Sequence, residues 1–579
     1  MTRHNQRPRE QDRIQEYDVV ICGAGLAGLT LARHLQQHYP ERTLLLLERM
    51  RRPLPQTTLK VGESTTEAGA YYLSHILNLP NYFEQNHISK AGFRFFFGHA
   101  HGSFADRPEF GITQLPTIPS FNIERGRLEN DLRQINADCG IPMIEGCIVK
   151  KIVPADHTDY HTVIYHNGEH TQKVRARWVI DAMGRRRYLQ KQLNLTKPQL
   201  RRGSAAWFRL PAQVDVSDLV PQNVREWHDR VPGRIRYAST NHLMGAGYWI
   251  WLIPLTSGAT SVGIVALEEI HPFDEFNTFN KARSWLQKYE PHLAAYLKDL
   301  QALDFKCMRR YSYSSQQMFS QARWACIGDA GIFSDPLYAP GVDFIALGNL
   351  ITTELIKLDF AGMLDEQVVT KYNRFILALN ETMTQTIQLS YPLFEHAVVM
   401  SAKVLWDTAA GWSLFAPQIF NPTFFTNDEV NAHLRKIKGA YYILSKRMQQ
   451  FFIEWAANSP GRFTFKFIDF LSLPFMQDIR NRNLRPGKSI DELVEDQRKN
   501  MHIFEELAQA LFLLAIKDVM PNQLERVFSA GWLNAWRISL KPERWTSDGL
   551  FRPHTEPRDL DNMVTQIRTL YQTKEMILT

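Results

Sequence analysis

The sequence is poor in cysteine: it has five cysteines in 579 residues, and none of their spacings predicts a pair. Proteins that rely on disulfides need paired cysteines, whereas a reducing compartment leaves thiols free. Two of the five fall in strands that we expect to be buried. We therefore predict a cytoplasmic protein in which Cys22, Cys139, Cys147, Cys307 and Cys326 form no disulfide framework.

The chain also lacks a long hydrophobic run. No stretch reaches the roughly 18 uncharged apolar residues that a membrane-spanning helix needs. The first 16 residues are polar and rich in arginine, which excludes a signal peptide as well as a span. We expect residues 1–16 to form a flexible arm, and any contact with a membrane to be peripheral.

Charge of one sign is not in large excess, because the sequence has 67 basic and 60 acidic residues. No block of lysine and arginine carries interleaved aromatic residues, so we expect no nucleic-acid partner. Internal repeats and low-complexity tracts are absent too. With 44% hydrophobic and 22% charged residues, the composition is that of a globular protein with a large core.

The segment 17–48 is the strongest positive feature. An expected strand at 17–22 precedes a G-x-G-x-x-G turn, a helical run to about residue 37 and a second strand at 43–48. Gly23 permits a tight turn, Gly25 lets the backbone approach a pyrophosphate, and Gly28 lets the helix pack on the strand. Glu48, twenty residues after Gly28, stands where an acid binds a ribose hydroxyl. We predict a dinucleotide site; an ordinary glycine turn is the alternative.

Further strands are expected at two places in the chain. The strand at 177–184 returns to the nucleotide-binding sheet, and 324–330 is its last core strand, followed by a helix from Val342 to about Leu358. Two β-rich regions are expected elsewhere: one begins with 93–97, and a second, at about 200–310, has strands near 205–209, 247–254 and 261–266. In the first of these regions His99 and His101 would share a strand face, but no third ligand has usable spacing, so we expect no metal site.

From about residue 376 the sequence is mostly helical and rich in aromatic residues. Phe451, Phe452 and Trp455 recur at helical spacing, which predicts a core face; a substrate groove or a membrane-facing surface is the alternative. Ser489 and Glu492 predict a capping box at the start of a long helix.

Three separated segments resemble the FAD-dependent monooxygenase fold: the first glycine turn, residues 181–184, and Gly328-Asp329. A fourth, the run Trp249-Ile-Trp251-Leu-Ile-Pro254, matches the W-x-W-x-I-P signature of flavin-dependent halogenases. As a strand, its period of two places both indoles on one face, where they can wall one cavity; a tryptophan-rich core strand is the alternative. The resemblance covers roughly residues 15–375 and only loosely the rest.

This resemblance implies an α/β fold in which a Rossmann-type FAD-binding domain at 17–375 is interrupted by a substrate-binding β-sheet. We place the sheet at about 93–120 and 200–310, and a helical C-terminal domain at 376–579. Residues 61–65 are similar to the family's flavin-loop motif, although an ordinary helix start capped by Thr65 or Thr66 is the alternative. The implied FAD-binding residues are Gly23, Gly25, Gly28, Glu48, Val61, Gly62, Glu63, Ser64, Arg127, Gly328, Asp329, Gly341 and Val342.

The implied chemistry is that of a two-component enzyme. A separate flavin reductase supplies FADH2, and O2 with chloride or bromide then gives hypohalous acid. Trp249 and Trp251 keep this acid from direct contact with the flavin, and it travels to Lys90 beside the substrate. An ammonium, with an ordinary pKa of about 10.4, donates hydrogen bonds that polarise the acid, whereas a neutral amine would itself be halogenated. A solvated surface lysine is the alternative for Lys90.

Two departures from the family pattern limit these expectations. Tyr338 stands where tryptophan halogenases have a glutamate, so we expect a phenol, pyrrole or polyketide-derived ring, free or on a carrier protein, in place of free tryptophan. The halide site falls at Pro340 and Gly341. Pro340 has no N–H to offer, which leaves Gly341 and Val342, and Asp343 would disfavour a nearby anion.

Three hypotheses follow. The first is a halogenase. The second is an FAD-dependent monooxygenase or reductase that acts on an aromatic or lipid-like substrate without halogenation, which Pro340 and the aromatic C-terminal region favour. The third is an FAD-binding protein without activity. We find no second glycine motif for a nicotinamide nucleotide, which favours reduction by a partner, although monooxygenases of this fold bind NADPH without one.

Overall fold

The computed structural model describes residues 14–55, 60–98, 102–155, 159–198 and 203–573. Most of the predicted arm, residues 1–13, and the pair His99 and His101 lie outside these ranges. Strand β1 (Gln15–Cys22) begins inside the stretch predicted as an arm, because Gln15 already pairs with Val174 of the neighbouring strand.

A mixed sheet of eight strands surrounds β1. Its order is β18 (Phe319–Ser320), β19 (Trp324–Cys326), β10 (His170–Asp181), β1, β2 (Leu44–Glu48) and β7 (Met143–Glu145), while β9 (His161–Asn167) joins β10 and β8 (Cys147–Val153) joins β9. The five strands from β19 to β7 run parallel. Parallel strands are covered on both faces, which explains why the four aliphatic residues of β2 are all buried.

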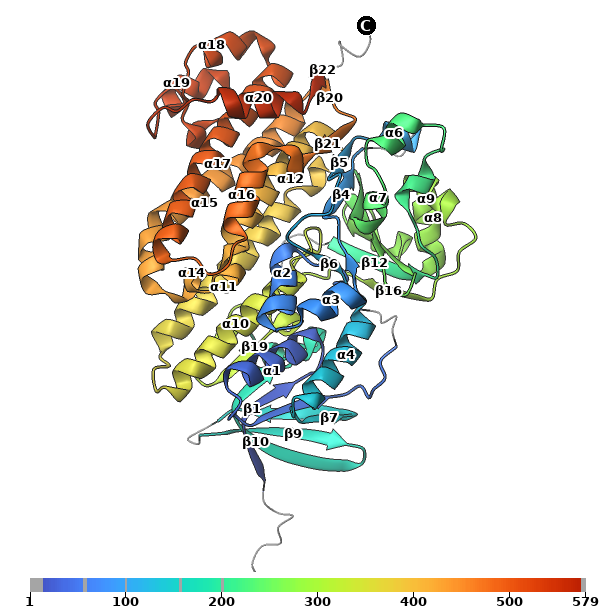
Figure 1. Ribbon diagram of the computed structural model, residues 1–579, viewed down its shortest axis with the longest axis vertical. Helices are drawn as coiled ribbons and strands as arrows, with labels where there is room; N and C mark the ends of the chain where they lie inside the picture. Colours follow the sequence, from blue (N-terminus) through green and yellow to red (C-terminus); the bar gives the residue numbers. More distant parts are fainter. Residues whose placement is uncertain (1–13, 56–59, 99–101, 156–158, 199–202, 574–579) are drawn as a thin grey trace, which may run out of the picture.

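Three helices pack on one face of this sheet. Helix α1 (Leu26–His38) contacts both α4 (Arg125–Asp138) and α10 (Gly341–Phe360), and Figure 1 shows the three running beside the strands. Since α1 starts directly after the glycine turn and α10 after the 335–341 segment, both helix N-termini point to the same end of the sheet. This is the edge at which ligands bind in open α/β sheets.

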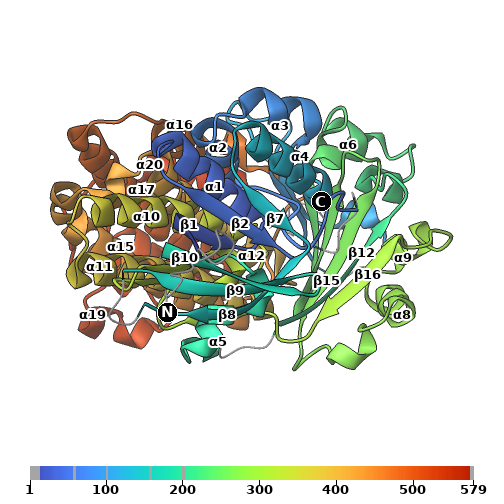
Figure 2. The same cartoon turned by 90° about the horizontal axis from the view of Figure 1, so that it is seen from below.

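A second sheet of eight strands lies beside the first. Its order is β16 (Asp304–Met308), β12 (Gly203–Leu210), β15 (Thr260–Leu267), β14 (Tyr248–Pro254), β13 (Thr240–Gly245), β4 (Phe93–Phe96), β5 (Glu109–Gly111) and β21 (Phe467–Asp469). Its strands thus come from residues near 93–111 and 203–308, with one edge strand from the C-terminal region. Figure 2 shows this sheet and the C-terminal helices on opposite sides of the first sheet.

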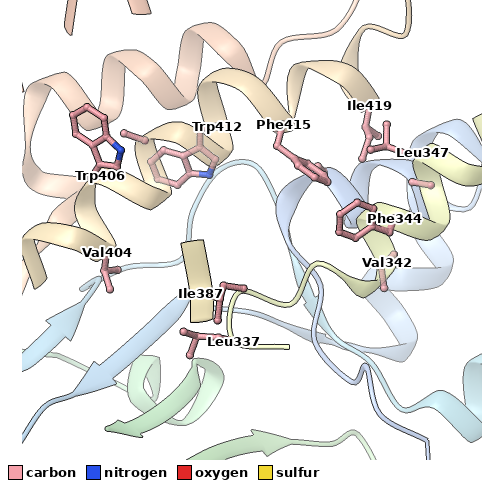
Figure 3. Close-up of a cluster of buried hydrophobic side chains, with 14 of the residues drawn as sticks. Leu337, Val342, Phe344, Leu347, Ile387, Val404, Trp406, Trp412, Phe415 and Ile419 are labelled. Atoms are coloured by element: carbon pink, nitrogen blue, oxygen red, sulfur yellow. The ribbon is translucent and has the colours of Figure 1, made fainter. Parts of the chain in front are cut away.

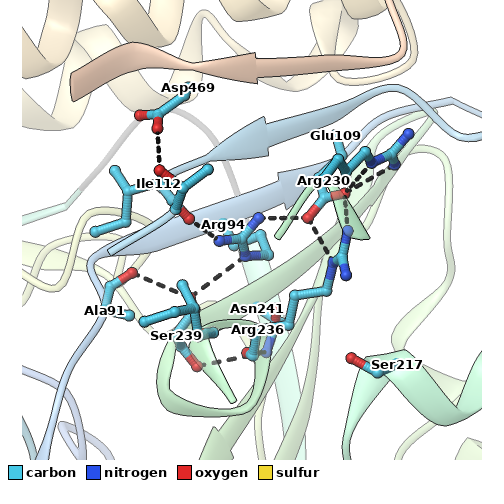
Figure 4. Close-up of polar contacts among 12 residues, drawn as sticks. Ala91, Arg94, Glu109, Ile112, Ser217, Arg230, Arg236, Ser239, Asn241 and Asp469 are labelled. Atoms are coloured by element: carbon cyan, nitrogen blue, oxygen red, sulfur yellow. Dashed lines mark hydrogen bonds and ion pairs between the residues drawn. The ribbon is translucent and has the colours of Figure 1, made fainter. Parts of the chain in front are cut away.

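A buried ion network stabilises the second sheet near β21. Figure 4 shows Glu109 of β5 between Arg94, Arg230 and Arg236. Burial alone would raise the pKa of Glu109, but the three guanidinium groups outweigh it and hold the pKa below its usual range. Removal of Glu109 would leave buried cations without a partner, which typically costs several kcal/mol.

The C-terminal region is helical, as predicted. Its long helices are α11 (Glu366–Gln388), α12 (Ala397–Ala410), α15 (Asp428–Asn458) and α17 (Ile490–Val519), with the shorter α16 (Pro474–Asn483) beside them. Ser489 and Glu492 form the predicted capping box of α17. Phe451, Phe452 and Trp455 are fully buried, so their stripe belongs to the core. The α/β class with a helical C-terminal region is therefore confirmed.

Candidate active site

One cavity of about 830 Å³ joins the first sheet to the second. Its wall combines the glycine turn, the 60–64 loop, the start of α4, the turn at Gly328, the tryptophan strand β14 and the start of α10. The predicted residues on its wall are Gly23, Gly25, Glu48, Val61, Gly62, Glu63, Ser64, Trp249, Trp251, Gly328, Asp329, Pro340, Gly341 and Val342. Segments more than 300 positions apart in the chain therefore line one cavity.

The three glycines of the turn have different surroundings. A Cβ on Gly23, whose φ is +109°, would lie 2.4 Å from the Ala182 carbonyl oxygen, and a Cβ on Gly28 would lie 2.0 Å from the Gly23 carbonyl oxygen. Gly25 opens onto the cavity, where the nearest atom to such a Cβ is Lys60 Nζ at 4.0 Å. Gly23 and Gly28 are thus required by packing, whereas Gly25 leaves room that a ligand can fill.

Two cationic side chains line the cavity onto which Gly25 opens. Lys60 and Arg125 both line the cavity and both bind the buried carboxylate of Glu129, with Arg125 Nη2 2.8 Å from Glu129 Oε1. Arg125 also donates to the Val61 carbonyl oxygen at 2.8 Å, which fixes the 61–64 loop against α4. An uncrowded glycine beside a helix N-terminus and two cations fits the pyrophosphate of a dinucleotide.

Arg125, and not the predicted Arg127, faces the cavity. Arg127 donates to Asn86 Oδ1 at 2.5 Å and is not part of the cavity wall. The two arginines are two positions apart at the start of one helix and therefore point to different faces. The sequence placed an arginine at this helix but did not specify which face would be turned inward.

Glu48 and Asp329 supply carboxylates at two ends of the cavity. Glu48 Oε2 accepts from the Ala24 N–H at 2.7 Å and Oε1 from the Met50 N–H at 2.8 Å, so the carboxylate is fixed beside the glycine turn. Burial raises the pKa of Asp329, while Arg125, Arg185 and Lys60 oppose the shift. These positions suit hydrogen bonds to sugar hydroxyls.

The two tryptophans of β14 line the same cavity. Their ring centroids are 5.7 Å apart, and both side chains project from one face of the strand, as its period predicts. Trp251 Nε1 donates to Ser261 Oγ at 3.1 Å, and Trp249 Nε1 donates to Tyr391 Oη at 3.2 Å. Both indoles are therefore held by hydrogen bonds as well as by packing.

A buried phenol–carboxylate network holds Trp249. Tyr391 and Tyr311 both donate to Asp335 Oδ2, at 2.6 and 2.5 Å. Asp335 opens the 335–341 segment, so this network ties the tryptophan wall to the loop before α10. No local pattern singles out Tyr311 or Tyr391, and the sequence did not identify them.

Lys90 is buried, with 2% of its surface exposed. Its Nζ donates to the Thr65 carbonyl oxygen at 2.8 Å and lies 4.0 Å from the centroid of the Phe93 ring. Phe93 lines the cavity, but Lys90 does not. Burial lowers the pKa of Lys90 to about 7, against the opposing effect of Glu67 and Asp343. The interpretation as a solvated surface lysine is therefore wrong.

The family model for tryptophan halogenases matches residues 101–398 of this chain, which is more than half of its length. The chain belongs to the tryptophan halogenase family. It is thus an FAD-dependent enzyme of the oxidoreductase type, as the W-x-W-x-I-P motif predicted.

Curated relatives and solved structures agree with this placement in the tryptophan halogenase family. Flavin-dependent halogenase chlA of Dictyostelium discoideum is 26% identical over 469 residues, which cover 73% of this chain and 75% of the relative. The 1H-pyrrole-2-carbonyl-(peptidyl-carrier protein) chlorinase of Pseudomonas fluorescens is 26% identical over 365 residues, 58% of this chain and 76% of the relative. The crystal structure of halogenase PltM superposes with a TM-score of 0.60 at 18% identity, covering 85% and 96% of the two chains. The last likeness supports the fold alone.

The start of α10 has fewer free amides than an ordinary helix N-terminus. Pro340 is the N-cap of α10, and the preceding Ala339 has φ +52°, in the left-handed region. Pro340 has no N–H, so the free amides that face the cavity wall here belong to Gly341 and Val342. Asp343 is buried and accepts from Thr66 Oγ1 at 2.6 Å, and burial raises its pKa to about 7.

Tyr338 turns toward the C-terminal helices. Its hydroxyl donates to Asp407 Oδ2 at 3.0 Å, and Asp407 also binds Lys403 and Gln449. Burial and the nearby Asp407 raise the pKa of Tyr338 well above its ordinary value, so the phenol is uncharged at neutral pH. Figure 3 shows apolar residues after Tyr338, among them Phe344, facing Phe415 and its neighbours on the C-terminal helices.

His242 of β13 is a further wall residue that sequence reasoning missed. It stacks on Phe95 with centroids 4.6 Å apart, and its Nδ1 lies 3.1 Å from the Arg94 carbonyl oxygen. Because a carbonyl accepts, Nδ1 carries the proton. Burial lowers the pKa of His242 to about 3, so the ring is neutral at physiological pH.

None of the helices in the described ranges is long and apolar enough to cross a membrane.

Proposed function

We propose that this protein is an FADH2-dependent halogenase that makes hypohalous acid from halide and O2 and halogenates an electron-rich aromatic or polyketide-derived substrate with the help of Lys90. The observation that carries this proposal is the single cavity whose wall includes a dinucleotide cradle at one end and Trp249, Trp251 and Phe93 at the other. Phe93 in turn contacts the Lys90 ammonium.

The cofactor fits the residues that are present. Gly25, the amides of α1 and the cations Lys60 and Arg125 would bind the pyrophosphate, Glu48 the adenosine ribose, and Asp329 the ribityl side. When bound, reduced FAD supplies the electrons with which O2 becomes an oxidant for halide. In this assignment Arg125 takes the role first expected of Arg127.

The tryptophans would act as a barrier. Trp249 and Trp251 present two large indoles, each held by a hydrogen bond, on the wall of the cavity. A rigid apolar wall excludes a bulky substrate from the cofactor while leaving space for a small oxidant. Neutral His242 beside them adds no charge that would attract competing anions.

Lys90 would orient the hypohalous acid by donating hydrogen bonds, which only its ammonium form does well. Its lowered pKa means that the ammonium and the amine coexist near pH 7. Halogen transfer from the polarised acid to the ring carbon breaks the oxygen–halogen bond and leaves hydroxide, and the proton that the ring then loses converts this hydroxide to water. Because Phe93 lines the cavity and its ring contacts Lys90, we propose that this ring contacts the acid on its way.

The halide would be held by the amides of Gly341 and Val342. Two N–H groups at a helix start favour an anion through the dipole of α10. Pro340 removes a third donor, and Asp343 adds negative charge as the pH rises, so halide affinity is expected to be modest and to fall above pH 7.

Two features support an uncharged aromatic substrate. Tyr338 supplies a neutral phenol in place of a carboxylate, which disfavours free tryptophan. Two relatives of this chain are, by name, a chlorinase and a brominase of 1H-pyrrole-2-carbonyl groups on a peptidyl-carrier protein. We therefore propose a phenol, a pyrrole or a polyketide-derived ring, free or on a carrier protein, and a flavin reductase as the partner that supplies FADH2.

Product analysis tests the proposal directly. Purified protein is mixed with FAD, a flavin reductase, NADH, bromide and a panel of phenols and carrier-bound pyrrole acids, and the products are followed by mass. Brominated products that disappear in Lys90→Met are expected. Oxygenated products alone would favour the monooxygenase alternative, which the proline at 340 supports, and reduction of the flavin by NADPH without a partner would do the same.

A further inference from the structure

Two side chains of the C-terminal region, Trp412 and Arg480, contact Glu67, an acid close to Lys90. Glu67 is the first residue of helix α2 (Glu67–Tyr71), directly after the Thr65–Thr66 pair that contacts Lys90 and Asp343. Its Oε2 accepts from Trp412 Nε1 at 3.4 Å, and its Oε1 lies 3.7 Å from Arg480 Nε. Trp412 and Arg480 expose only 7% and 4% of their surface.

The buried ammonium of Lys90 depends on nearby negative charge to keep its proton. Among the described residues, no carboxylate is in ion-pair contact with its Nζ, whose partners are the Thr65 carbonyl oxygen and the Phe93 ring. The charged or titratable groups that act on Lys90 from the surrounding elements are Glu67 of α2, Asp343 of α10 and His242 of β13. A buried ammonium without a nearby negative charge loses its proton.

The two acids are not equivalent. Asp343 is buried, and its own pKa is raised to about 7, so it carries only part of its charge near neutral pH. Glu67 has a guanidinium beside it and has the larger effect of the two on the Lys90 pKa. His242 is neutral and contributes no charge at this pH.

We propose that Glu67 is the positioning residue that keeps Lys90 in its ammonium form, and that Trp412 and Arg480 of the C-terminal region hold Glu67 in place for this purpose. The helical third of the chain thereby acts on the charge of Lys90 through Glu67. This inference rests on the proposed role of Lys90 in halogenation.

The pH dependence of halogenation provides the first test. Glu67→Gln should move the alkaline limb of the kcat profile to lower pH by about one unit, which is the effect of one nearby opposite charge. At pH 8 this lowers kcat about tenfold, whereas at pH 6 kcat falls only about twofold, and the KM for substrate is unchanged. Trp412→Phe, which keeps the ring and loses the N–H, should shift the limb less, in the same direction. Glu67→Asp keeps the negative charge and should leave the alkaline limb at its wild-type position. Glu84→Gln, at an exposed glutamate, is the matched control.

A second measurement separates this inference from the halogenase proposal, because it needs no activity. FAD-loaded protein without halide or substrate is treated with formaldehyde and a borane reductant at pH 6–10, and methylation of Lys90 is quantified by peptide mass. Only the neutral amine reacts, so Glu67→Gln should lower the midpoint by about one unit. An unchanged midpoint overturns the inference, even if halogenation is observed. A shifted midpoint in a protein that never halogenates supports the inference and refutes the proposed function.

If Lys90 is methylated in neither the wild type nor Glu67→Gln, a double-mutant cycle on stability provides the test. At pH 7 Glu67→Gln should lower Tm in the wild-type background more than in Lys90→Met, because its partner charge is absent from the latter. Equal effects of Glu67→Gln in the two backgrounds would overturn the inference.

Discussion

Replacing Gly25 by alanine should separate cofactor binding from folding. Gly25 has φ −82° and ψ −174°, a conformation open to any residue, and the nearest atom to an added Cβ is 4.0 Å away. Alanine at such a site restricts the unfolded chain, so the apoprotein should keep its stability or gain about 0.4–1 kcal/mol. The methyl group would occupy the space assigned to the pyrophosphate.

The expected loss of affinity follows from the contacts that the methyl group would displace. One hydrogen bond to a charged group contributes about 1.5–3 kcal/mol, which corresponds to a decrease in affinity of roughly tenfold to 150-fold. Quenching of FAD fluorescence measures Kd, and thermal unfolding of the apoprotein measures Tm. Gly25→Ala with an unchanged Kd would refute the placement of the pyrophosphate, and a large drop in apoprotein Tm would refute the claim that the site is open.

Four further predictions follow from the same geometry. Gly28→Ala should lower the Tm of the apoprotein sharply, because its Cβ would meet the Gly23 carbonyl oxygen at 2.0 Å; thermal unfolding beside Gly25→Ala as control checks this, and an equal Tm for both variants contradicts it. Halogenation should be maximal below pH 7 and fall about tenfold by pH 8, since the Lys90 pKa of about 7 is lowered from its usual value and the ammonium is lost as pH rises; a flat kcat profile from pH 6 to 8 would exclude this role. Pro340→Ser should add a halide donor and lower the KM for bromide by about tenfold, measured at fixed FADH2; an unchanged KM would move the halide elsewhere. Ala339→Gly should raise the free energy of unfolding by about 1 kcal/mol, because φ +52° is strained for alanine; denaturant unfolding measures this, and a decrease would contradict it.

The sequence was most informative where local chemistry decides the structure. The glycine turn, the alternation of the β14 tryptophans and the Ser489–Glu492 capping box each depend on residues a few positions apart, and the structure contains all three. The fold class and the family followed from the order of such motifs along the chain.

The sequence was least informative about the orientation of helices and about long-range partners. Arg125 and Arg127 are chemically identical, and only the packing of α4 decides which one faces the cavity. Tyr391, Trp412 and Arg480 reach the site from the C-terminal region, more than 140 positions after the Trp249 strand, and no periodicity connects them to it. The burial of Lys90 depends on Phe93 and Thr65 together, which a single motif does not reveal.

The strand β21 has a consequence for how the chain is made. Its residue Phe467 pairs with Glu109 of β5, 358 positions earlier (467 − 109), and closes the edge of the second sheet. At a ribosomal rate of about 5–20 residues per second, β5 would wait roughly 20–70 s for this partner. During that interval its backbone N–H and C=O groups and the arginines around Glu109 are without their final neighbours. Nascent chains that end before β21 should therefore bind chaperones or aggregate, whereas chains that extend beyond it should not.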